Sequence, residues 1–581
     1  MILRVRRTGP GPFAPSPSPS ASGGPRRRTA HRHHASGPRA VRPGGTPWRP
    51  PHRTRLVLRR PSMKRRTALQ ASIGVVVTLT LAACGGGQSD SKGAGAGPVD
   101  LTIALSSAPN SLDPSAVAVG PFLNYMDPAY ATLLTRRPDG SLGAGLADKW
   151  GYVGKKNTTF ELRLRKGAKF ADGTPVTATD VVNSFTYFQK GSGPAAAWFR
   201  PLTFATSGSS TVVITSPTPN PDMGTLFTPP YMGGAIISPA GLRTPKKLAS
   251  STFGAGPYVY SAQQSVSGDH YVYVPNKNFY DQSAIHFKKI TVRVMPNVNS
   301  QVQALKSGQI DLMYGTPDVA PTVKGDKAIT TLQKPTTWAG LFLLDREGTV
   351  VKGLGDVRVR QALNFAVDRA AITKAVYGDY GTPVSQPQMP GYDGYSPEAA
   401  KMYPYDPAKA KKLLKAAGYG SGLTIPVNYG SFDPSTAKMV QAVQQQLAQV
   451  GVKLKLRAAT NFGGWINDLL TKKYAATVLS PGTGGEANFY AQQPPFSKTG
   501  IMNVFGADDP DVDAAYARLA SADAKAGAQA SVDLTDVIVR KALALPISGT
   551  DTIAMYNSEL RGVKFPPGGA QLTSNTLWTT R

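Results

Sequence analysis

Cysteine and histidine are scarce in this chain of 581 residues, and their scarcity excludes several classes of protein. Cys84 is the only cysteine, so no internal disulfide can form and no cluster of thiolates can bind a metal. Four of the six histidines lie within the first 52 residues, which leaves only His270 and His286 further along. Because there is also no G-x-S-x-G string, a hydrolase with a Ser-His-Asp triad is not expected.

Acidic residues are absent from residues 1–83, although this stretch holds 17 of the 65 Lys and Arg residues. The formal net charge of +30 therefore overstates the basic character of the rest, since residues 84–581 contain 48 basic and 35 acidic residues. These charges are spread along the chain and form no basic stripe, so nucleic acid is not expected as a partner.

Residues 1–62 consist mainly of Pro, Arg, Gly, Ser and His, a composition that cannot bury a hydrophobic core. We interpret them as an extension that is disordered or not translated, because a complete export signal occupies residues 63–83. The signal has a basic start, Lys64-Arg65-Arg66, and an apolar segment over residues 68–81 that is too short to span a bilayer. The paired arginines leave open whether export follows the general or the twin-arginine route.

Residues 81–84 read Leu-Ala-Ala-Cys and resemble a bacterial lipobox, with small residues before the cleavage point and a thiol that accepts the lipid. Residues 84–98 are rich in Gly and Ser, which predicts a flexible tether. We therefore expect an extracytoplasmic protein that is anchored through lipid on Cys84 to the outer face of the cytoplasmic membrane. A buried structural cysteine is the alternative, and its position after an apolar segment disfavours it.

From residue 99 onward, strand and helix patterns follow one another irregularly, which predicts an α/β fold. Period-two alternation of apolar residues predicts strands over residues 99–105 and 160–165. A helix is predicted after Asp406, because Pro407 suits its first turn and Gly418 follows its last.

Further helix starts are legible in the sequence. Thr177 followed by Asp180 predicts a capped helix start. Apolar residues at helical spacing predict another helix over residues 435–450, with Ser435 at its cap.

Short strings of a recognisable kind then follow along the chain, each of them weak alone. They are SLDP (111–114), LADKW (146–150), FELRLRKGAKFADGTPVTATDVVNSF (160–185), GAGPY (254–258), NKNFY (276–280), SGQIDL (307–312), VRVRQALNFAVDR (357–369) and DPAKAKKLLKAAGY (406–419). Together and in this order they resemble the extracytoplasmic solute-binding proteins of family 5, which serve peptide and nickel ABC importers.

The resemblance implies a two-lobed periplasmic-binding-protein-like fold of type II, with the ligand trapped in a cleft between the lobes. It implies lobe I over residues 99–140, 246–340 and 546–581, an added subdomain over 141–245, and lobe II over 341–545. The expected partners are a small solute (peptide-like, sugar or chelate) and the permease and ATPase subunits of an importer. We expect a monomer without a cofactor and without enzymatic activity.

Most of these strings are expected to build the fold and not the binding site. In the string over residues 357–369 and beside it, Asp356 and Asp368 lie close in sequence to Arg358, Arg360 and Arg369. We therefore predict that these charges form structural ion pairs.

The ligand site is predicted from the resemblance alone. Tyr314 and Phe462 are expected to line it, Phe462 from a loop after a strand over residues 452–456. A further segment, residues 480–488, is expected to contribute Ser480, Gly482, Glu486 and Asn488. Gly482 stands where peptide-binding relatives carry an aspartate for the ligand's ammonium group, which disfavours simple dipeptides unless Glu486 takes over. A bulkier or neutral solute, such as a sugar or a modified peptide, is then favoured.

Two other functions are weighed against solute binding. Ser435 and Lys438 form an S-x-x-K string, and residues 498–500 read K-T-G, as in serine β-lactamases and penicillin-binding proteins. No S-D-N string lies between them, so an acyl-transfer enzyme is the disfavoured alternative. A directly ligated metal has few candidate ligands beyond His270 and His286.

Overall fold

The computed structural model describes residues 99–117, 122–137, 140–193, 195–479, 496–498, 500, 502–565 and 572–580. All of them belong to one compact unit that extends from Asp90 to Arg581. The predicted export signal, Cys84 and the segment that holds Ser480, Gly482, Glu486 and Asn488 lie outside the described residues. No described helix is long and apolar enough to cross a membrane.

A mixed sheet of 11 strands forms the centre of the described fold, in the order β15-β14-β16-β12-β17-β11-β1-β10-β9-β8, with β13 also paired to β17. Its strands are β1 (Val99–Leu105), β8 (Tyr258–Tyr260), β9 (His270–Pro275), β10 (Phe287–Val294), β11 (Leu312–Gly315), β12 (Ile329–Leu343), β13 (Gly381–Pro383), β14 (Leu423–Gly430), β15 (Val452–Ala459), β16 (Ala476–Leu479) and β17 (Ala544–Asn557). The strand predicted over residues 99–105 is thus confirmed as β1.

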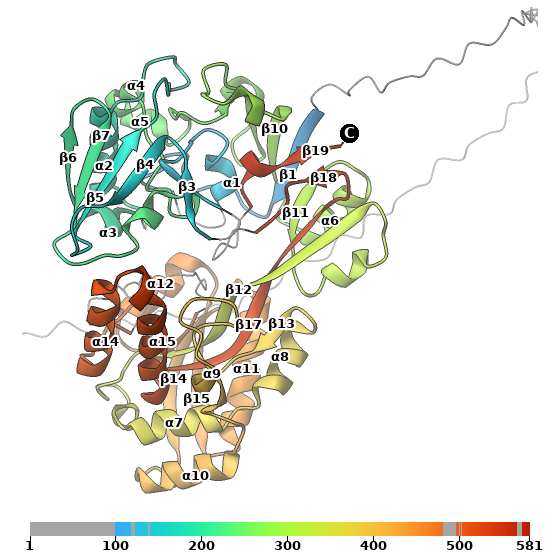
Figure 1. The fold of residues 1–581 in the computed structure, drawn as a ribbon. Helices are drawn as coiled ribbons and strands as arrows, with labels where there is room; N and C mark the ends of the chain where they lie inside the picture. The colour runs from blue at the N-terminus through green and yellow to red at the C-terminus, as the bar shows by residue number, and fades with distance from the viewer. Residues whose placement is uncertain are drawn as a thin grey trace, which may run out of the picture. The chain divides into compact units, whose positions relative to one another are not determined.

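The strands β12 and β17 pass from one hydrophobic core to another (Figure 1). They pair antiparallel from Ile329 opposite Asn557 to Phe342 opposite Ala544. At the end of the pair that holds Ile329 and Asn557, the buried hydrophobic residues come from residues 101–329 and 553–577. At the end that holds Phe342 and Ala544, they come from residues 338–547. We call these two parts lobe I and lobe II.

We propose that the lobe boundaries lie where the sequence places them, at residues 340/341 and 545/546. Support comes from β12 and β17, since each boundary falls inside one of these two strands.

A second sheet lies within the segment between residues 141 and 245, with its strands in the order β4-β5-β7-β6. In β5 (Thr159–Leu164), Phe160, Leu162 and Leu164 are buried while Glu161 and Arg163 are exposed, as the alternating pattern predicts. The helix α2 (Ala178–Gln189) packs beside this sheet, and Thr177 and Asp180 form the predicted capping box at its start. The other strands are β4 (Ala147–Tyr152), β6 (Thr203–Ser207) and β7 (Thr211–Thr215).

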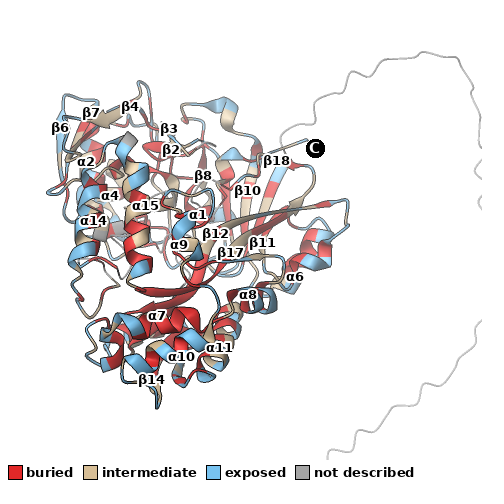
Figure 2. Cartoon of the chain, turned by 60° about the horizontal axis from the view of Figure 1, so that its bottom comes forward, coloured by how far each residue is buried: buried red, intermediate tan, exposed pale blue. Residues whose placement is uncertain are grey.

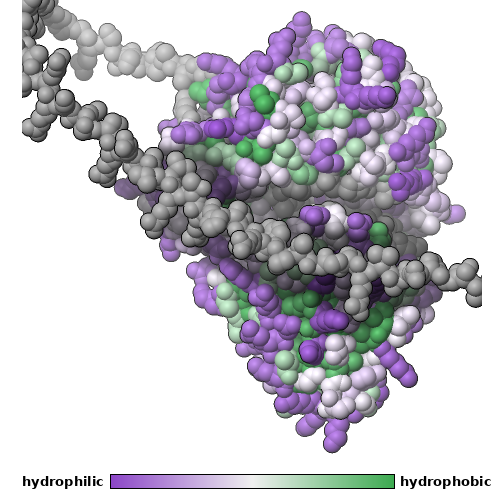
Figure 3. Space-filling model, turned by 180° about the vertical axis from the view of Figure 1, so that it is seen from behind, coloured by the Kyte–Doolittle hydropathy of each residue, from purple (hydrophilic) through white to green (hydrophobic). Residues whose placement is uncertain are grey.

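Helices surround the sheet in lobe II and bury one face each. They are α7 (Val357–Phe365), α8 (Arg369–Tyr377), α10 (Pro407–Ala416), α11 (Pro434–Ala448), α12 (Phe462–Leu470), α14 (Pro510–Ser521) and α15 (Ala524–Arg540). Figure 2 shows buried residues on one side of α7, α10 and α11 and exposed residues on the other. The exposed face of α10 carries four lysines. Figure 3 shows hydrophilic side chains at the lower tip of the molecule, below a hydrophobic patch.

The predicted ends of α10 are confirmed. Asp406 accepts a hydrogen bond from the Lys409 amide at 2.8 Å, and Pro407 opens the first turn. Gly418 follows the helix with a φ of +87°, in the left-handed region that glycine adopts without strain.

The ion pairs predicted around α7 and α8 form only in part. Arg358 contacts Asp356 with an Nη2–Oδ2 distance of 2.5 Å. Arg360 and Arg369 instead donate to backbone carbonyls, those of Leu354, Lys541, Pro546 and Tyr403 among them. The prediction is wrong for these two arginines, because both are buried where backbone carbonyl oxygens, and not carboxylates, lie within hydrogen-bond reach. Asp368 serves as the N-cap of α8 and accepts from the Ala371 amide at 2.9 Å.

The end of the chain is fastened to lobe I through Asp127, which is only 2% exposed. Its Oδ2 accepts hydrogen bonds from the amide (2.6 Å) and the hydroxyl (2.8 Å) of Ser574. Nearby, the Asn124 side chain donates to the carbonyl of Leu572 at 2.7 Å. Burial raises the pKa of the Asp127 carboxyl to about 7, against an ordinary value of 3.8.

This raised pKa predicts a pH dependence of folding stability. A carboxyl that binds its proton more tightly in the folded chain contributes stability that is complete below about pH 4 and is lost as the pH rises through about 7. Each pKa unit corresponds to about 1.4 kcal/mol. The matched variant is Asp127→Asn, which keeps an acceptor for Ser574 but carries no titratable group. In urea unfolding, we expect the free energy of unfolding of the wild type to fall between pH 5 and pH 8.5 by more than that of Asp127→Asn. An equal difference between the two proteins at both pH values would contradict this.

Candidate functional site

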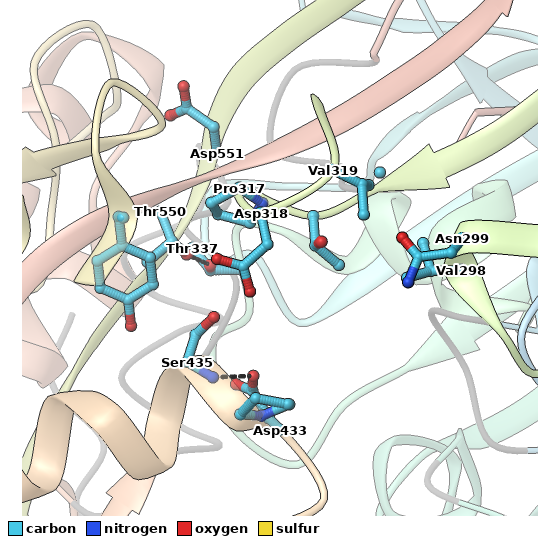
Figure 4. A pocket seen from close by; sticks show the side chains of 14 residues that line it. Val298, Asn299, Pro317, Asp318, Val319, Thr337, Asp433, Ser435, Thr550 and Asp551 are labelled. Atoms are coloured by element: carbon cyan, nitrogen blue, oxygen red, sulfur yellow. Dashed lines mark hydrogen bonds between the residues drawn. The ribbon is translucent and has the colours of Figure 1, made fainter. Parts of the chain in front are cut away.

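A cavity of about 480 Å³ lies where lobe I, lobe II and the two crossing strands meet (Figure 4). Lobe I contributes the start of α6 (Val298–Lys306) and residues 315–319 after β11. The crossing strands contribute Thr337, Thr550 and Asp551, and lobe II contributes Tyr377 and residues 433–435 at the start of α11. Strand ends and helix starts from both lobes therefore form its walls.

This position follows from the topology of the sheet. In lobe I, β1 runs parallel to β10 and β11, and in lobe II, β14 runs parallel to β15 and β16. Loops that follow parallel strands collect at one edge of a sheet, and ligands of α/β proteins bind there. Residues 315–319 begin at the end of β11 in lobe I, and residues 433–435 begin α11 after β14 in lobe II, so both segments lie at such an edge.

The start of α11 is fixed by Asp433 and not by Ser435. Asp433 Oδ1 accepts from the Ser435 amide at 3.0 Å, and its Oδ2 accepts from the Thr436 hydroxyl at 2.6 Å. The sequence-based assignment of Ser435 as the cap is therefore wrong by two residues, because Pro434 takes the first helical position. Ser435 lies in the first turn and faces the cavity (Figure 4).

The crossing strands line the cavity with hydroxyl groups. Thr337 and Thr550 join their side chains across the pair, and Thr336 Oγ1 lies 2.5 Å from Thr552 Oγ1. Asp551 follows on β17, and burial raises the pKa of its carboxyl to about 6. Its Oδ1 is buried without a hydrogen-bond partner among the described residues, and in Figure 4 the carboxyl group points away from Asp433 and Ser435.

The cavity is acidic. Asp318, Asp433 and Asp551 line it, whereas its described lining residues include no Lys or Arg. The nearest cation that the structure pairs with them is Lys438, whose Nζ lies 3.5 Å from Asp318 Oδ2. Carboxylates and hydroxyls together suit a solute that donates hydrogen bonds, above all one with a protonated amine.

The residues predicted to bind ligand fall in different places. Tyr314 lies in β11, where its hydroxyl donates to Asn124 Oδ1 at 3.1 Å and accepts from the Leu572 amide at 2.9 Å. It precedes the lining residue Gly315 but does not itself line this cavity. Phe462 is the first residue of α12, so its placement in a loop is wrong; Asn461 caps that helix by accepting from the Gly464 amide. Ser480, Gly482, Glu486 and Asn488 lie outside the described residues.

Sequence reasoning missed most of the cavity. Asp318, Thr337, Tyr377, Thr550 and Asp551 were not singled out, and the last two are more than 200 residues from Thr337. A signal was available for one wall only, because Asp-Pro-Ser at residues 433–435 is a typical helix start, and in the structure it follows β14. The carboxyl end of a strand followed by a helix start is where such sites lie.

The acyl-transfer alternative gains no support from the geometry. Lys438 pairs with Asp318, and Lys498 pairs with Asp508 on an exposed surface. His270 lies between Asp269 Oδ2 (2.5 Å) and the carbonyl of Gln264 (3.0 Å). In the part of the chain that the structure describes, no three His, Cys, Asp or Glu side chains gather where they could hold a metal ion.

The pair formed by Asp318 and Lys438 joins the two lobes across the cavity and generates a prediction. Both side chains are more than half exposed, so we expect a coupling of only about 0.2–1 kcal/mol that is screened by salt. Lys438→Gln should therefore increase the radius of gyration in solution scattering at low salt. The matched control is Lys374→Gln, which breaks an exposed pair with Asp379 inside lobe II and should leave the radius unchanged. Equal radii for both variants would contradict a link between the lobes.

Comparisons with known proteins agree with this architecture. Residues 141–503, more than half of the chain, match the bacterial extracellular solute-binding proteins, family 5. The probable D,D-dipeptide-binding periplasmic protein DdpA of Escherichia coli K12 is 28% identical over 62% of this chain and 70% of its own length. The glutathione-binding protein GsiB of Pectobacterium atrosepticum is 30% identical over 62% of this chain and 69% of its own length.

A solved structure shares the fold. It is the binding protein AgaA from A. tumefaciens R10 in complex with agropinic acid, and it superimposes with a TM-score of 0.71 at 21% identity. The match covers 83% of this chain and 98% of that one. At this identity the likeness establishes the two-lobed fold alone.

Proposed function

The chain belongs to the bacterial extracellular solute-binding proteins of family 5, the substrate-binding proteins of ABC importers, and we propose that it captures a peptide-like solute with a protonated amine for its permease. The observation that carries the proposal is the acidic, hydroxyl-lined cavity between the lobes. A buried ammonium group needs a carboxylate partner, and those of Asp318 and Asp433 line this cavity.

Closure of the lobes is the mechanism that the cavity supports. A ligand that contacts residues of both lobes, such as Asp318 and Ser435, binds the closed form better than the open form and shifts the population towards it. The crossing strands β12 and β17 allow this movement without unfolding either core. The permease would then receive only the closed, loaded protein.

Binding of the solute generates the main test. Mass spectrometry of small molecules released from the denatured protein should identify a peptide-like amine, and adding it back should raise the melting temperature by RT ln(1 + [L]/Kd). Ser435→Trp fills the cavity and should weaken binding at least tenfold. The control Ser209→Trp alters an exposed turn in the added subdomain and should bind like wild type. Unchanged affinity in Ser435→Trp would place the solute elsewhere.

The remaining predicted residues refine the solute class. Tyr314, Phe462, Ser480, Gly482 and Asn488 stay predictions as ligand contacts, and Glu486 stays the predicted substitute for the ammonium-binding aspartate. If calorimetry shows tight dipeptide binding that persists in Glu486→Gln, the carboxylates of the cavity are sufficient. If Glu486→Gln alone abolishes binding, Glu486 holds the amine. A sugar or a metal chelate is the second candidate, and recovery of either from the protein would replace the first.

We further propose that lipid on Cys84 anchors the protein outside the cytoplasmic membrane, as the lipobox-like string indicates. Cys84→Ser should leave the protein without lipid, either uncleaved or released into the medium, while its melting temperature and solute affinity stay unchanged. Cell fractionation and metabolic labelling with palmitate measure both outcomes. A variant that is still membrane-bound and labelled would refute the anchor.

A further inference from the structure

A second cavity, of about 290 Å³, lies apart from the interlobe cavity and shares no lining residue with it. It is enclosed by the segment after α1 (Leu123–Met126), by residues 229–230 and 279–284, and by η7 (Ser574–Thr576) near the end of the chain. Hydrogen bonds of Asn124 with Leu572 and of Asp127 with Ser574 hold this part of the chain beside α1. Every wall therefore belongs to lobe I or the added subdomain.

The cavity contains an unsatisfied buried acid. Asp127 lines it and binds Ser574 through Oδ2 alone, while Oδ1 is buried without a hydrogen-bond partner among the described residues. Asn575 lines it as well, and its Oδ1 is also buried and unpartnered there. Two unsatisfied acceptors are costly unless a donor reaches them, which is the role of an ammonium or hydroxyl group.

A positively charged side chain, that of Arg136, also lines this cavity. The Arg136 guanidinium donates to the carbonyl of Gly140 and to Thr225 Oγ1, each at 2.7 Å, which holds it in place. A guanidinium recognises a carboxylate through paired N–H donors. An acid and a base in one cavity disfavour a ligand with a single charge and favour one that carries both.

Part of the wall is apolar, with Phe279 and Tyr280 contributing aromatic rings and Ala284 a methyl group. Polar residues complete the wall, namely a second acid, Asp281, and four threonines, Thr132, Thr135, Thr573 and Thr576. Arg165 stacks on the Tyr280 ring at 3.8 Å, which fixes that side chain. Because one water molecule occupies about 30 Å³ of liquid, the cavity has room for about ten non-hydrogen atoms. That is the size of a free amino acid with an aliphatic side chain.

We propose that this cavity is a second binding site, for the zwitterion of a small apolar amino acid. Asp127 and Asn575 accept from its ammonium group, Arg136 donates to its carboxylate, and the aromatic wall packs against its side chain. This assignment is independent of the solute that binds between the lobes. Because Asp127 also holds Ser574, a bound amino acid would stabilise the docking of the C-terminal segment on lobe I.

Calorimetry on the purified full-length protein tests the site with three matched probes. They are L-leucine, isoamylamine, which lacks the carboxylate, and 4-methylpentanoate, which lacks the amine. We expect leucine to bind and each of the other two to bind at least tenfold more weakly. Equal binding of isoamylamine, or no binding of leucine, would overturn the proposal.

Variants locate the bound leucine. Ala284→Phe fills the second cavity without touching the contacts of Asp127 with Ser574, and it should abolish leucine binding. Asp127→Asn should also abolish leucine binding. If Asp127→Asn folds poorly, Ala284→Phe alone still tests the site. Ser435→Trp, which blocks the interlobe cavity, should leave leucine binding intact. Loss of binding in Ser435→Trp with retention in Ala284→Phe would mean that leucine occupies the interlobe cavity, and the second site would be refuted.

Discussion

The pairing of β12 with β17 is the constraint on which the rest of the described structure depends. These strands belong to both lobes, so each core is built against one end of the same two-stranded ladder. The register shifts twice along it, between Pro335 and Thr337 and between Ala339 and Gly340. Proline donates no backbone hydrogen bond and a bulge increases local twist, so we expect the ladder to be weakened along residues 335–340. Two threonine pairs cross the strands at this segment, and one of them, Thr337 with Thr550, lines the cavity.

Buried polar contacts fasten β17 firmly on both sides of that segment. In lobe II, Arg369 donates to the carbonyl of Pro546 and Asn364 donates to that of Ala544. Towards lobe I, the amide of Asn557 donates to the carbonyl of Asp311. Removing either partner of such a bond leaves a buried polar group unsatisfied. We therefore expect movement between the lobes to occur in the middle of the ladder, next to the interlobe cavity.

A feature of the structure can be predicted from the sequence when the residues that form it are close together in the chain. The capping box of Thr177 and Asp180, the start of α10 at Asp406 and the strand β1 follow from residues a few positions apart, and all are confirmed. The partners of Arg369 do not follow, because Asp368 stands next to it in sequence while the carbonyls of residues 403 and 546 bind it in the fold. The lining of the cavity is harder still to predict, since Thr337 and Thr550 meet only through the pairing of β12 with β17.

The strings that reveal the family say little about the solute, and the structure gives the physical reason. In GAGPY, an added Cβ at Gly254 or Gly256 would lie 2.3–2.4 Å from backbone atoms of Ala129, so these glycines permit a close approach between two segments of lobe I. In the string over residues 357–369, Arg360 and Arg369 satisfy carbonyls of lobe II. Such positions tolerate little change whatever the ligand is. The interlobe cavity is lined instead by loop residues such as Asp318, whose side chain is 66% exposed and is not required by either core. Residues of this kind can vary without loss of the fold, so the choice of solute is made at positions that the family strings leave free.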